Sequence, residues 1–147
     1  MSCVVSPLAP ADRPAWEVLA RGYKAFYETE VADAGYEEAW RRLLARDGVH
    51  GLSGKLDGRL VGIAHYLFHG STWARSVCYL QDLFVSPDSR GRGVARALIE
   101  AVADAARAEG AERYYWLTQE KNGVARALYD RVGQFHGFIR YDYPLEK

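Results

Sequence analysis

Apolar residues recur along the chain at two spacings, and each spacing is typical of one kind of secondary structure. Helical spacing, with apolar residues three or four positions apart, is found in residues 11–22, 37–45, 93–109 and 123–132. Runs of strand length are found in residues 3–8, 50–56, 61–68, 77–85, 113–118 and 138–143. The order β-α-α-β-β-β-α-β-α-β predicts an α/β fold, a mixed sheet with helices on its faces.

Turn and capping residues set several of these boundaries. The Asp57-Gly58 pair between two strand-like runs is a hairpin signal. Gly110 is placed to end the helix over residues 93–109, and Asn122 is placed to cap the helix over residues 123–132. We find no internal repeat or Pro-rich linker, so residues 1–147 are expected to form one domain.

Composition narrows the classes of function. Lys plus Arg and Asp plus Glu number 19 each, which gives no support for a nucleic-acid or membrane partner. Cys3 and Cys78 are too few for a disulfide framework. No apolar run approaches the roughly 20 residues that cross a bilayer, and the N-terminus lacks the pattern of a signal peptide. We therefore expect a cytoplasmic enzyme.

The segment S-R-G-R-G-V-A-R, residues 89–96, joins a predicted strand to a predicted helix. Small residues at a helix start let backbone N–H groups face a ligand, and Arg90, Arg92 and Arg96 add positive charge. The loop therefore predicts a site for a phosphate ester, although a simple strand-to-helix turn would also use glycine. It matches neither G-x-x-x-x-G-K-[ST] nor G-x-G-x-x-G.

Five blocks together resemble one enzyme family. They are Y-L-Q-D-L-F-V (79–85), R-G-R-G-V-A (90–95), Y-W-L-T-Q-E-K-N (115–122), A-R-A-L-Y-D-R-V-G (125–133) and G-F-I-R-Y (137–141). This combination resembles the GCN5-related N-acetyltransferases (GNAT), closest to the branch with yeast histone and polyamine acetyltransferases and bacterial small-amine acetyltransferases. The resemblance implies the GNAT fold with splayed central strands, and direct transfer from acetyl-CoA to an amine.

The resemblance also assigns cofactor contacts. The pyrophosphate would lie on the loop residues, which are Arg90, Gly91, Arg92, Gly93, Val94, Ala95 and Arg96. The pantetheine arm would run along Leu83, Phe84 and Val85, in the gap between the splayed strands. Asn122 would bond the cofactor's amides. Tyr129, seven residues later on the same helix, would protonate the departing thiolate.

The general base is less closely defined by sequence. Polyamine-type relatives carry Glu at the position of Gln81, which cannot accept a proton at neutral pH. Asp82 is the first candidate, because a bulge in the splayed strand can redirect its side chain. Glu28, Glu30 and Glu120 are further candidates that would act through water.

Aromatic faces favour an ammonium group, and four residues could wall the acceptor pocket: Tyr27, Trp40, Tyr66 and Trp73. The acceptor site is expected to comprise Tyr27, Glu28, Trp73 and Gln81. An acidic patch could attract a cation, and it consists of Glu28, Glu30, Asp33, Glu37 and Glu38. More than half of the aromatic residues are expected to belong to the core instead.

Several further expectations complete the hypothesis. His65 and His69 are four apart in a strand and turn without a third ligand, so no metal is expected. Family analogy implies a homodimer. The acceptor is a small-molecule or peptide amine. The alternatives are an acyl-CoA-binding regulatory module without turnover, and a transferase of a larger acyl group.

Overall fold

The computed structural model describes residues 2–146 and contains two compact units, with the boundary between Leu117 and Thr118. The first unit holds β1 (Val4–Pro7), a 3-10 helix (Pro10–Asp12), α1 (Arg13–Phe26), α2 (Asp33–Ala45), β2 (His50–Leu56), β3 (Arg59–His69), β4 (Val77–Val85), a second 3-10 helix (Pro87–Ser89), α3 (Val94–Glu109) and β5 (Arg113–Trp116). The second unit holds α4 (Gly123–Val132).

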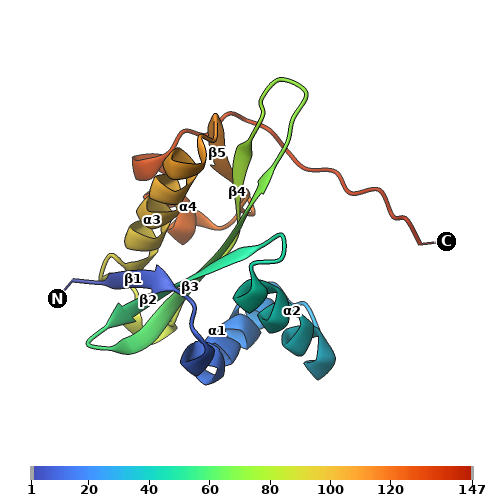
Figure 1. Cartoon of the computed structure of the whole chain (residues 1–147). Coiled ribbons are helices and arrows are strands. Elements are labelled where there is room, and N and C mark those ends of the chain that lie inside the picture. Colours follow the sequence, from blue (N-terminus) through green and yellow to red (C-terminus); the bar gives the residue numbers. More distant parts are fainter. Residues whose placement is uncertain (1, 147) are drawn as a thin grey trace. The chain divides into compact units, whose positions relative to one another are not determined.

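The five strands form one mixed sheet in the order β1-β2-β3-β4-β5. The first four pair antiparallel with their neighbours, and β5 pairs parallel with β4. Figure 1 shows α1 and α2 on one face of this sheet and α3 on the other. The α/β class and the mixed sheet predicted from sequence are confirmed.

Apolar side chains fill both sides of the sheet. On the face covered by α1 and α2, the buried cluster is Trp16, Leu19, Ala20, Tyr36, Trp40, Leu43 and Ile63. On the other face α3 lies very close to the strands, because a Cβ at Gly62 would be 2.7 Å from the Val94 side chain. Leu98 and Val102 are fully buried there. The sheet is thus held from both sides, which fixes the path of β4.

Two irregularities distinguish β4. It pairs with β5 only from Val77 to Leu80, so within residues 2–146 the following residues of β4 have no strand partner on that side. The ladder with β3 also shifts register, because His65 pairs with Asp82 while Tyr66 pairs with Leu80. One residue of β4, Gln81, is therefore extra, which is the geometry of a β-bulge. The splayed strands and the bulge expected from sequence are both present.

Two helices are longer than their apolar pattern predicts. α1 continues past Gly22 to Phe26, because this glycine allows a close approach: a Cβ there would lie 3.0 Å from the Phe84 ring. α2 begins at Asp33, four residues before the predicted start, and Tyr36 in its first turn is buried. Burial of aromatic surface therefore extends both helices beyond the positions where glycine and polar residues suggested a boundary.

The last strand predicted from sequence, over residues 138–143, is wrong. Residues 134–146 contain neither helix nor strand. The side chains of Phe138, Ile139, Tyr141 and Tyr143 are exposed. Their alternation is typical of a strand, but a strand forms only when its backbone groups pair with a neighbour, and the sequence pattern does not supply that neighbour.

Candidate active site

A chain of hydrogen bonds leads from the core to the bulge of β4. The Trp16 indole Nε1 donates to His65 Nε2 at 2.9 Å, and His65 Nδ1 lies 2.9 Å from Asp82 Oδ2. Trp16 is almost fully buried, whereas the Asp82 side chain keeps 22% of its exposure. The carboxylate therefore meets solvent at the end of a buried polar chain.

The fold positions each member of this chain by simple periodicity. Trp16 and Tyr23 are seven residues apart on α1, so both face the sheet. His65 follows Ile63 on the same face of β3. On β4 the bulge leaves Gln81 exposed and places Asp82 opposite His65. The two side chains that sequence could not assign to a face are thus separated.

Opposing effects act on the Asp82 carboxyl. Burial raises its pKa, but hydrogen bonds from His65 and Tyr23 and the nearby charge of Lys24 outweigh burial, so that the net pKa is below its ordinary value. The Tyr23 hydroxyl also donates to the carbonyl of Gln81 at 3.5 Å. Burial, followed by the Asp82 charge, raises the pKa of Tyr23, which stays a hydrogen-bond donor at any physiological pH. Asp82 is accordingly an anion at neutral pH.

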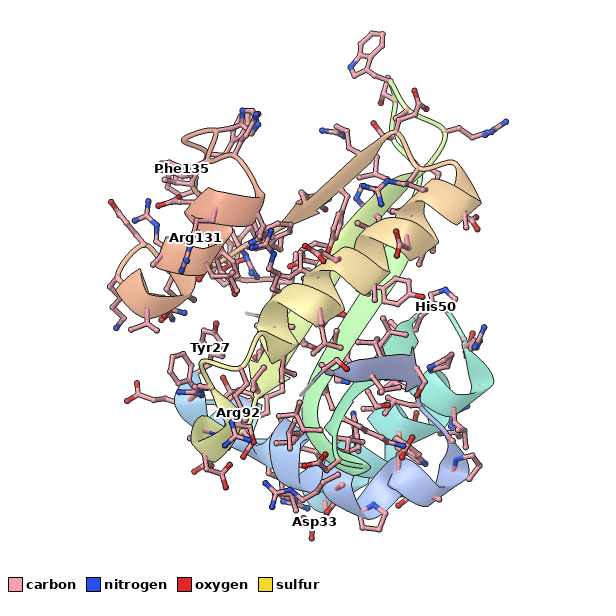
Figure 2. The ribbon with its side chains drawn as sticks, turned by 90° about the vertical axis from the view of Figure 1, so that its left-hand side faces the viewer. Tyr27, Asp33, His50, Arg92, Arg131 and Phe135 are labelled. Carbon is pink, nitrogen blue, oxygen red and sulfur yellow. The ribbon has the colours of Figure 1, made fainter. Side chains whose placement is uncertain are left out.

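Aromatic rings at the end of α1 pack around Tyr23, which hydrogen-bonds this carboxylate. Tyr23 packs against Tyr27 with ring centroids 4.9 Å apart and meets the edge of Phe84 at 6.3 Å. Phe26 packs on Tyr27 in turn. Figure 2 shows Tyr27, from the end of α1, on the same side of the drawn face as Arg92 and well away from His50. Of the four residues expected to wall the acceptor pocket, Tyr27 is the one in this group, and its role there stays a prediction.

The other predicted aromatic residues have different surroundings. Trp40 is buried and packs on Trp16, with centroids 5.0 Å apart, and Tyr66 stacks on His50. Both belong to the core. Trp73 lies on the loop between β3 and β4 and is 91% exposed, beyond the last pair of that hairpin. Its place in the acceptor site stays a prediction.

The loop between β4 and α3 has the conformation that a phosphate site needs. Gly91 and Gly93 adopt φ of 80° and 79°, in the region that favours glycine. Gly93 is the N-cap residue of α3 and provides no side-chain cap, so the first-turn amides of that helix are not bonded by a capping side chain. Nothing lies within 4 Å of a Cβ built at either glycine. The loop is therefore open where an anion would approach.

The three arginines of this loop point to different partners. Arg90 Nε donates to the carbonyl of Val85 at 3.3 Å, and its guanidinium lies over the Phe84 ring. Arg96 pairs with Glu100 at 3.0 Å. Arg92 is exposed, and its charge is one of several influences, after a hydrogen bond from Ser86, that lower the pKa of Asp88. Arg90 thus supports the loop, and Arg92 is the arginine best placed to meet a ligand.

The end of β4 offers backbone groups for an extended ligand. Leu83, Phe84 and Val85 pair with β3 on one side, opposite Ala64, Ile63 and Gly62. The other side of these three residues is past the last pair with β5. Alternate N–H and C=O groups of an unpaired strand edge can bind an extended chain. The pantetheine contacts assigned from sequence are compatible with this geometry and stay a prediction.

The second unit carries the remaining predicted residues. Asn122 is the N-cap residue of α4, but its side chain makes no capping bond and instead donates to the Thr118 hydroxyl at 3.4 Å. Tyr129 lies on α4, partly buried, and its carbonyl accepts from the N–H of Gly133. Figure 2 shows Arg131 and Phe135 at the end of the same helix. The roles assigned to Asn122 and Tyr129 stay predictions.

The acidic patch is largely paired with arginine. Asp33 meets Arg21 at 2.7 Å, Glu37 meets Arg13 at 2.9 Å, and Glu38 contacts Arg41 and Arg42. These pairs weaken its attraction for a cationic acceptor. Glu28 and Glu30 are exposed after α1, and Glu120 lies between β5 and α4. Asp82 alone among the candidate bases combines partial burial with a defined hydrogen-bond network in the part of the chain described.

Sequence reasoning missed three residues of this network: Trp16, Tyr23 and His65. Trp16 resembles any core residue of an amphipathic helix, and Tyr23 lies beyond the predicted end of α1. His65 was considered only as a metal ligand. The missing information is the register between β3 and β4, since only that register places His65 opposite Asp82. A polar residue in an apolar strand was the one available signal.

Neither a metal cluster nor a membrane helix is found in the described chain. Within residues 2–146, no three His, Cys, Asp or Glu side chains are grouped as a metal site. Over the same residues no helix has the length and apolar character that a bilayer crossing requires. Cys3 and Cys78 are both free thiols.

Comparison with known protein sequences identifies the family that the sequence motifs resemble. The family model described as the acetyltransferase (GNAT) family matches residues 15–134. The D-amino-acid N-acetyltransferase HPA3 of Saccharomyces cerevisiae is 34% identical over 135 residues, covering 88% of this chain and 83% of the yeast protein. A thialysine N-epsilon-acetyltransferase of Caenorhabditis elegans is 32% identical over 95 residues, covering 65% of this chain and 59% of the relative.

Solved structures agree at the level of the fold. The aminoglycoside acetyltransferase AAC(6')-Iy, solved with a bisubstrate analogue of coenzyme A and acetylneamine, superposes with a TM-score of 0.87. The two chains cover each other completely and are 18% identical. At this identity the likeness concerns the architecture, which includes the mixed sheet and the helices on its faces.

Proposed function

The chain belongs to the acetyltransferase (GNAT) family and is an acetyl-CoA-dependent N-acetyltransferase, and we propose that Asp82 receives the proton of its amine acceptor. In the proposed reaction the acceptor nitrogen attacks the thioester carbonyl, so that an N–C bond forms and the C–S bond breaks. From a neutral amine the nitrogen loses one proton, and the thiolate of coenzyme A gains one. An acceptor that arrives as an ammonium ion first gives up one further proton, which passes to solvent. No covalent enzyme intermediate is required.

The observation that carries the proposal is the position of Asp82. It lies on the bulge where β4 loses its β5 partner, and its carboxylate is held as an anion beside Tyr23, whose ring meets the edge of Phe84. A carboxylate attracts an ammonium group, and aromatic faces favour the same ligand. Asp82 can therefore hold the acceptor and take its proton, directly or through one water molecule.

Cofactor binding follows from the neighbouring loop. The first-turn amides of α3 and the side chain of Arg92 would hold the pyrophosphate, with Gly91 and Gly93 providing the left-handed turns. The free edge of residues 83–85 would hold the pantetheine arm. Asn122 and Tyr129 keep the roles that the family resemblance assigns, with Tyr129 protonating the departing thiolate.

The acceptor class is a primary amine on a small molecule, a polyamine, an amino acid or a protein lysine. The named relatives are a D-amino-acid N-acetyltransferase and a thialysine N-epsilon-acetyltransferase. These names make amino acids the first acceptors to test on this chain. The pairing of the acidic patch with arginines argues against a strongly polycationic acceptor.

A second candidate function is an acyl-CoA-binding module without turnover, which the residue at position 81 favours. Gln81 stands where polyamine-type relatives carry a glutamate, and it is exposed on the bulge. Transfer of a larger acyl group is a further variant of the enzyme hypothesis. Comparing the rates of transfer from acetyl-CoA, propionyl-CoA and succinyl-CoA shows whether the enzyme prefers the acetyl group or a larger acyl group.

We further propose that the protein forms a homodimer, functions in the cytoplasm and acts as one domain over residues 1–147. The family model extends from residue 15 to residue 134, across the boundary between the two compact units, which supports a single functional domain. The free thiols of Cys3 and Cys78 are compatible with a reducing compartment. Dimerisation rests on family analogy.

The variant Asp82→Asn tests the proposal, because it keeps the shape of the side chain and removes the charge. We expect kcat/KM to fall roughly 10²-fold at every pH from 6 to 9, since the variant cannot accept the amine proton. The low pKa of Asp82 leaves the wild-type carboxylate ionised throughout the range from pH 6 to pH 9. Thiol release from acetyl-CoA with an amino acid acceptor measures the rate.

Asp104→Asn is the matched control, because Asp104 is an exposed residue of α3 that pairs with Arg107. It should behave as wild type at every pH. Wild-type rates in Asp82→Asn across this pH range would overturn the assignment of the proton acceptor, and the base would then be sought among Glu28, Glu30 and Glu120.

A further inference from the structure

The buried end of the hydrogen-bond chain determines which protons its members carry. An indole N–H can only donate, so His65 Nε2, 2.9 Å from Trp16 Nε1, must be the acceptor. The single ring proton of a neutral imidazole then lies on Nδ1, which faces Asp82 Oδ2 at 2.9 Å. A doubly protonated ring would place two N–H groups against each other at Trp16. Both hydrogen bonds therefore run in one direction, from Trp16 to His65 to Asp82.

This arrangement cannot carry a proton into the protein. Trp16 has no acceptor site, and it occupies the only lone pair of His65. A proton that reaches Asp82 must leave again on its exposed side. The chain thus fixes the orientation and the negative charge of the carboxylate, and it does not act as a relay.

Burial makes these donors necessary. The Asp82 side chain is 22% exposed and that of His65 is 11% exposed, and an ionised carboxyl in such a position is costly unless several donors surround it. The charged and titratable groups that face Asp82 come from two elements: His65 from β3, and Tyr23 and Lys24 from α1. Tyr27 and Tyr79 lie near Tyr23 on the same side. The hydrogen bond of His65 Nδ1 to the carboxylate is 2.9 Å long.

We propose that Trp16 and His65 are positioning residues for catalysis, which hold Asp82 as an oriented anion through a one-way chain of hydrogen bonds. This inference rests on the proposed function of Asp82 as proton acceptor. The inference adds Trp16 and His65 to the residues needed for catalysis, and both act through Asp82 and not by contact with the acceptor or the cofactor. It also explains why a histidine lies among the apolar residues of β3 and why its partner is a tryptophan of α1.

Three substitutions test the proposal through the pH dependence. His65→Leu removes the donor, whereas His65→Asn keeps an N–H close to the position of Nδ1. His69→Leu is the control, because His69 is a partly buried residue of the same strand whose hydrogen bonds are to Gly70 and Tyr115 and not to Asp82. We compare kcat/KM of each variant with wild type at pH 8 and at pH 5.5, so that ionisation of the amine cancels.

His65→Leu should lose about tenfold more activity at pH 5.5 than at pH 8, because without its donor the buried carboxyl is protonated at higher pH. His65→Asn should stay within about threefold of wild type at both values, and His69→Leu should match wild type. An equal loss in His65→Leu at the two pH values, or no rescue by asparagine, would overturn the proposal, since a purely structural role predicts both.

Nuclear magnetic resonance tests the chain without any reaction. The ¹⁵N shifts of wild-type His65 should be those of the neutral ring protonated on Nδ1. The ¹³C titration of Asp82 should move upward by about three pH units in His65→Leu, the shift that a tenfold loss of the ionised carboxylate at pH 5.5 requires. A ring protonated on Nε2, or an unmoved titration, would contradict the inference. The two hypotheses can fail separately. If Asp82→Asn has wild-type activity, Asp82 is not the proton acceptor, but the spectra of wild type and His65→Leu still report whether the hydrogen-bond chain exists.

Trp16→Phe provides a second route to the same conclusion. It frees His65 Nε2, so that the ring can take the other tautomer and withdraw its donor from Asp82. We expect the ¹⁵N signature of His65 to change and the activity at pH 5.5 to fall more than at pH 8. If the folded variant keeps the Nδ1-protonated ring, Trp16 does not set the tautomer and its positioning role is excluded.

Discussion

Asp82 and Gln81 are neighbours in sequence, yet their surroundings give them different chemical properties. Gln81 is exposed on the bulge, whereas Asp82 is surrounded by donors from β3 and α1. In a regular strand consecutive residues face opposite sides, and here the extra residue preserves that alternation while changing the register with β3. A carboxylate at position 82 can therefore serve where the relatives' glutamate is missing.

Tyr129→Phe tests the residue assigned as general acid. Its hydroxyl has a reference pKa near 10, so a tyrosine at this position is protonated at neutral pH and can donate to a thiolate. Removing only the oxygen should lower the single-turnover rate by roughly 10² while the affinity for acetyl-CoA and the melting temperature stay close to wild type. Rapid-quench measurement of transfer gives the rate, and calorimetry gives the affinity.

Tyr114→Phe is the control for that substitution, because Tyr114 is a tyrosine of β5 whose hydroxyl donates to the carbonyl of Ile99. It should leave the chemical rate unchanged. If Tyr129→Phe transfers acetyl at the wild-type rate, the acid is another group, and water or the ammonium ion of the acceptor supplies the proton.

At the scale of elements, the loop and the first turn of α3 are the proposed cofactor site. Gly93→Glu should weaken coenzyme A binding by at least about a hundredfold, because a carboxylate would stand where amides meet pyrophosphate. Gly110→Glu is a close control, since Gly110 ends the same helix with φ of 79° and has equally open surroundings. Both variants carry the same backbone strain, so calorimetry on the folded proteins separates strain from binding.

Equal affinity in Gly93→Glu and Gly110→Glu would place the phosphate elsewhere. Replacing a single arginine of the loop should reduce the affinity for coenzyme A less than Gly93→Glu does. Arg92→Ala and Arg96→Ala should each weaken binding no more than about fivefold, because exposed ion pairs contribute little and Arg96 already pairs with Glu100.

The sequence allowed most elements to be predicted, because their apolar residues repeat at the spacing of the element. β4, α3 and α4 begin and end within one or two residues of the expected positions. The end of α1 was not predictable, because Gly22 resembles a helix stop and only its contact with Phe84 explains why the helix continues. The strand over residues 138–143 failed for the opposite reason, since alternation does not reveal whether a neighbour exists.

The candidate site was predictable where a motif is local in sequence. The loop from Arg90 to Arg96 could be identified from its own residues. The network of Trp16, His65 and Asp82 could not, because its members are 49 and 17 residues apart and meet only through the register of the sheet. The proposed cofactor loop and the candidate base could therefore be named from sequence, whereas the donors around that base could not.

At the scale of the whole molecule, the balanced charge gives no long-range attraction for a charged partner. The predicted homodimer is tested by sedimentation equilibrium at micromolar concentration. We expect a mass of twice the chain's 16.5 kDa. A single species of monomer mass across the concentration range would exclude the dimer and would leave the proposed chemistry of Asp82 intact.

The most direct test of the account is the identification of a product. Purified protein is incubated with acetyl-CoA and a panel of primary amines, beginning with D-amino acids and thialysine, and the mixture is analysed by mass spectrometry. We predict an N-acetylated amine, formed with one free coenzyme A thiol for each product molecule and at a rate that Asp82→Asn lowers roughly 10²-fold. Binding of acetyl-CoA without any acetylated amine across the panel would contradict the account and would favour the acyl-CoA-binding module.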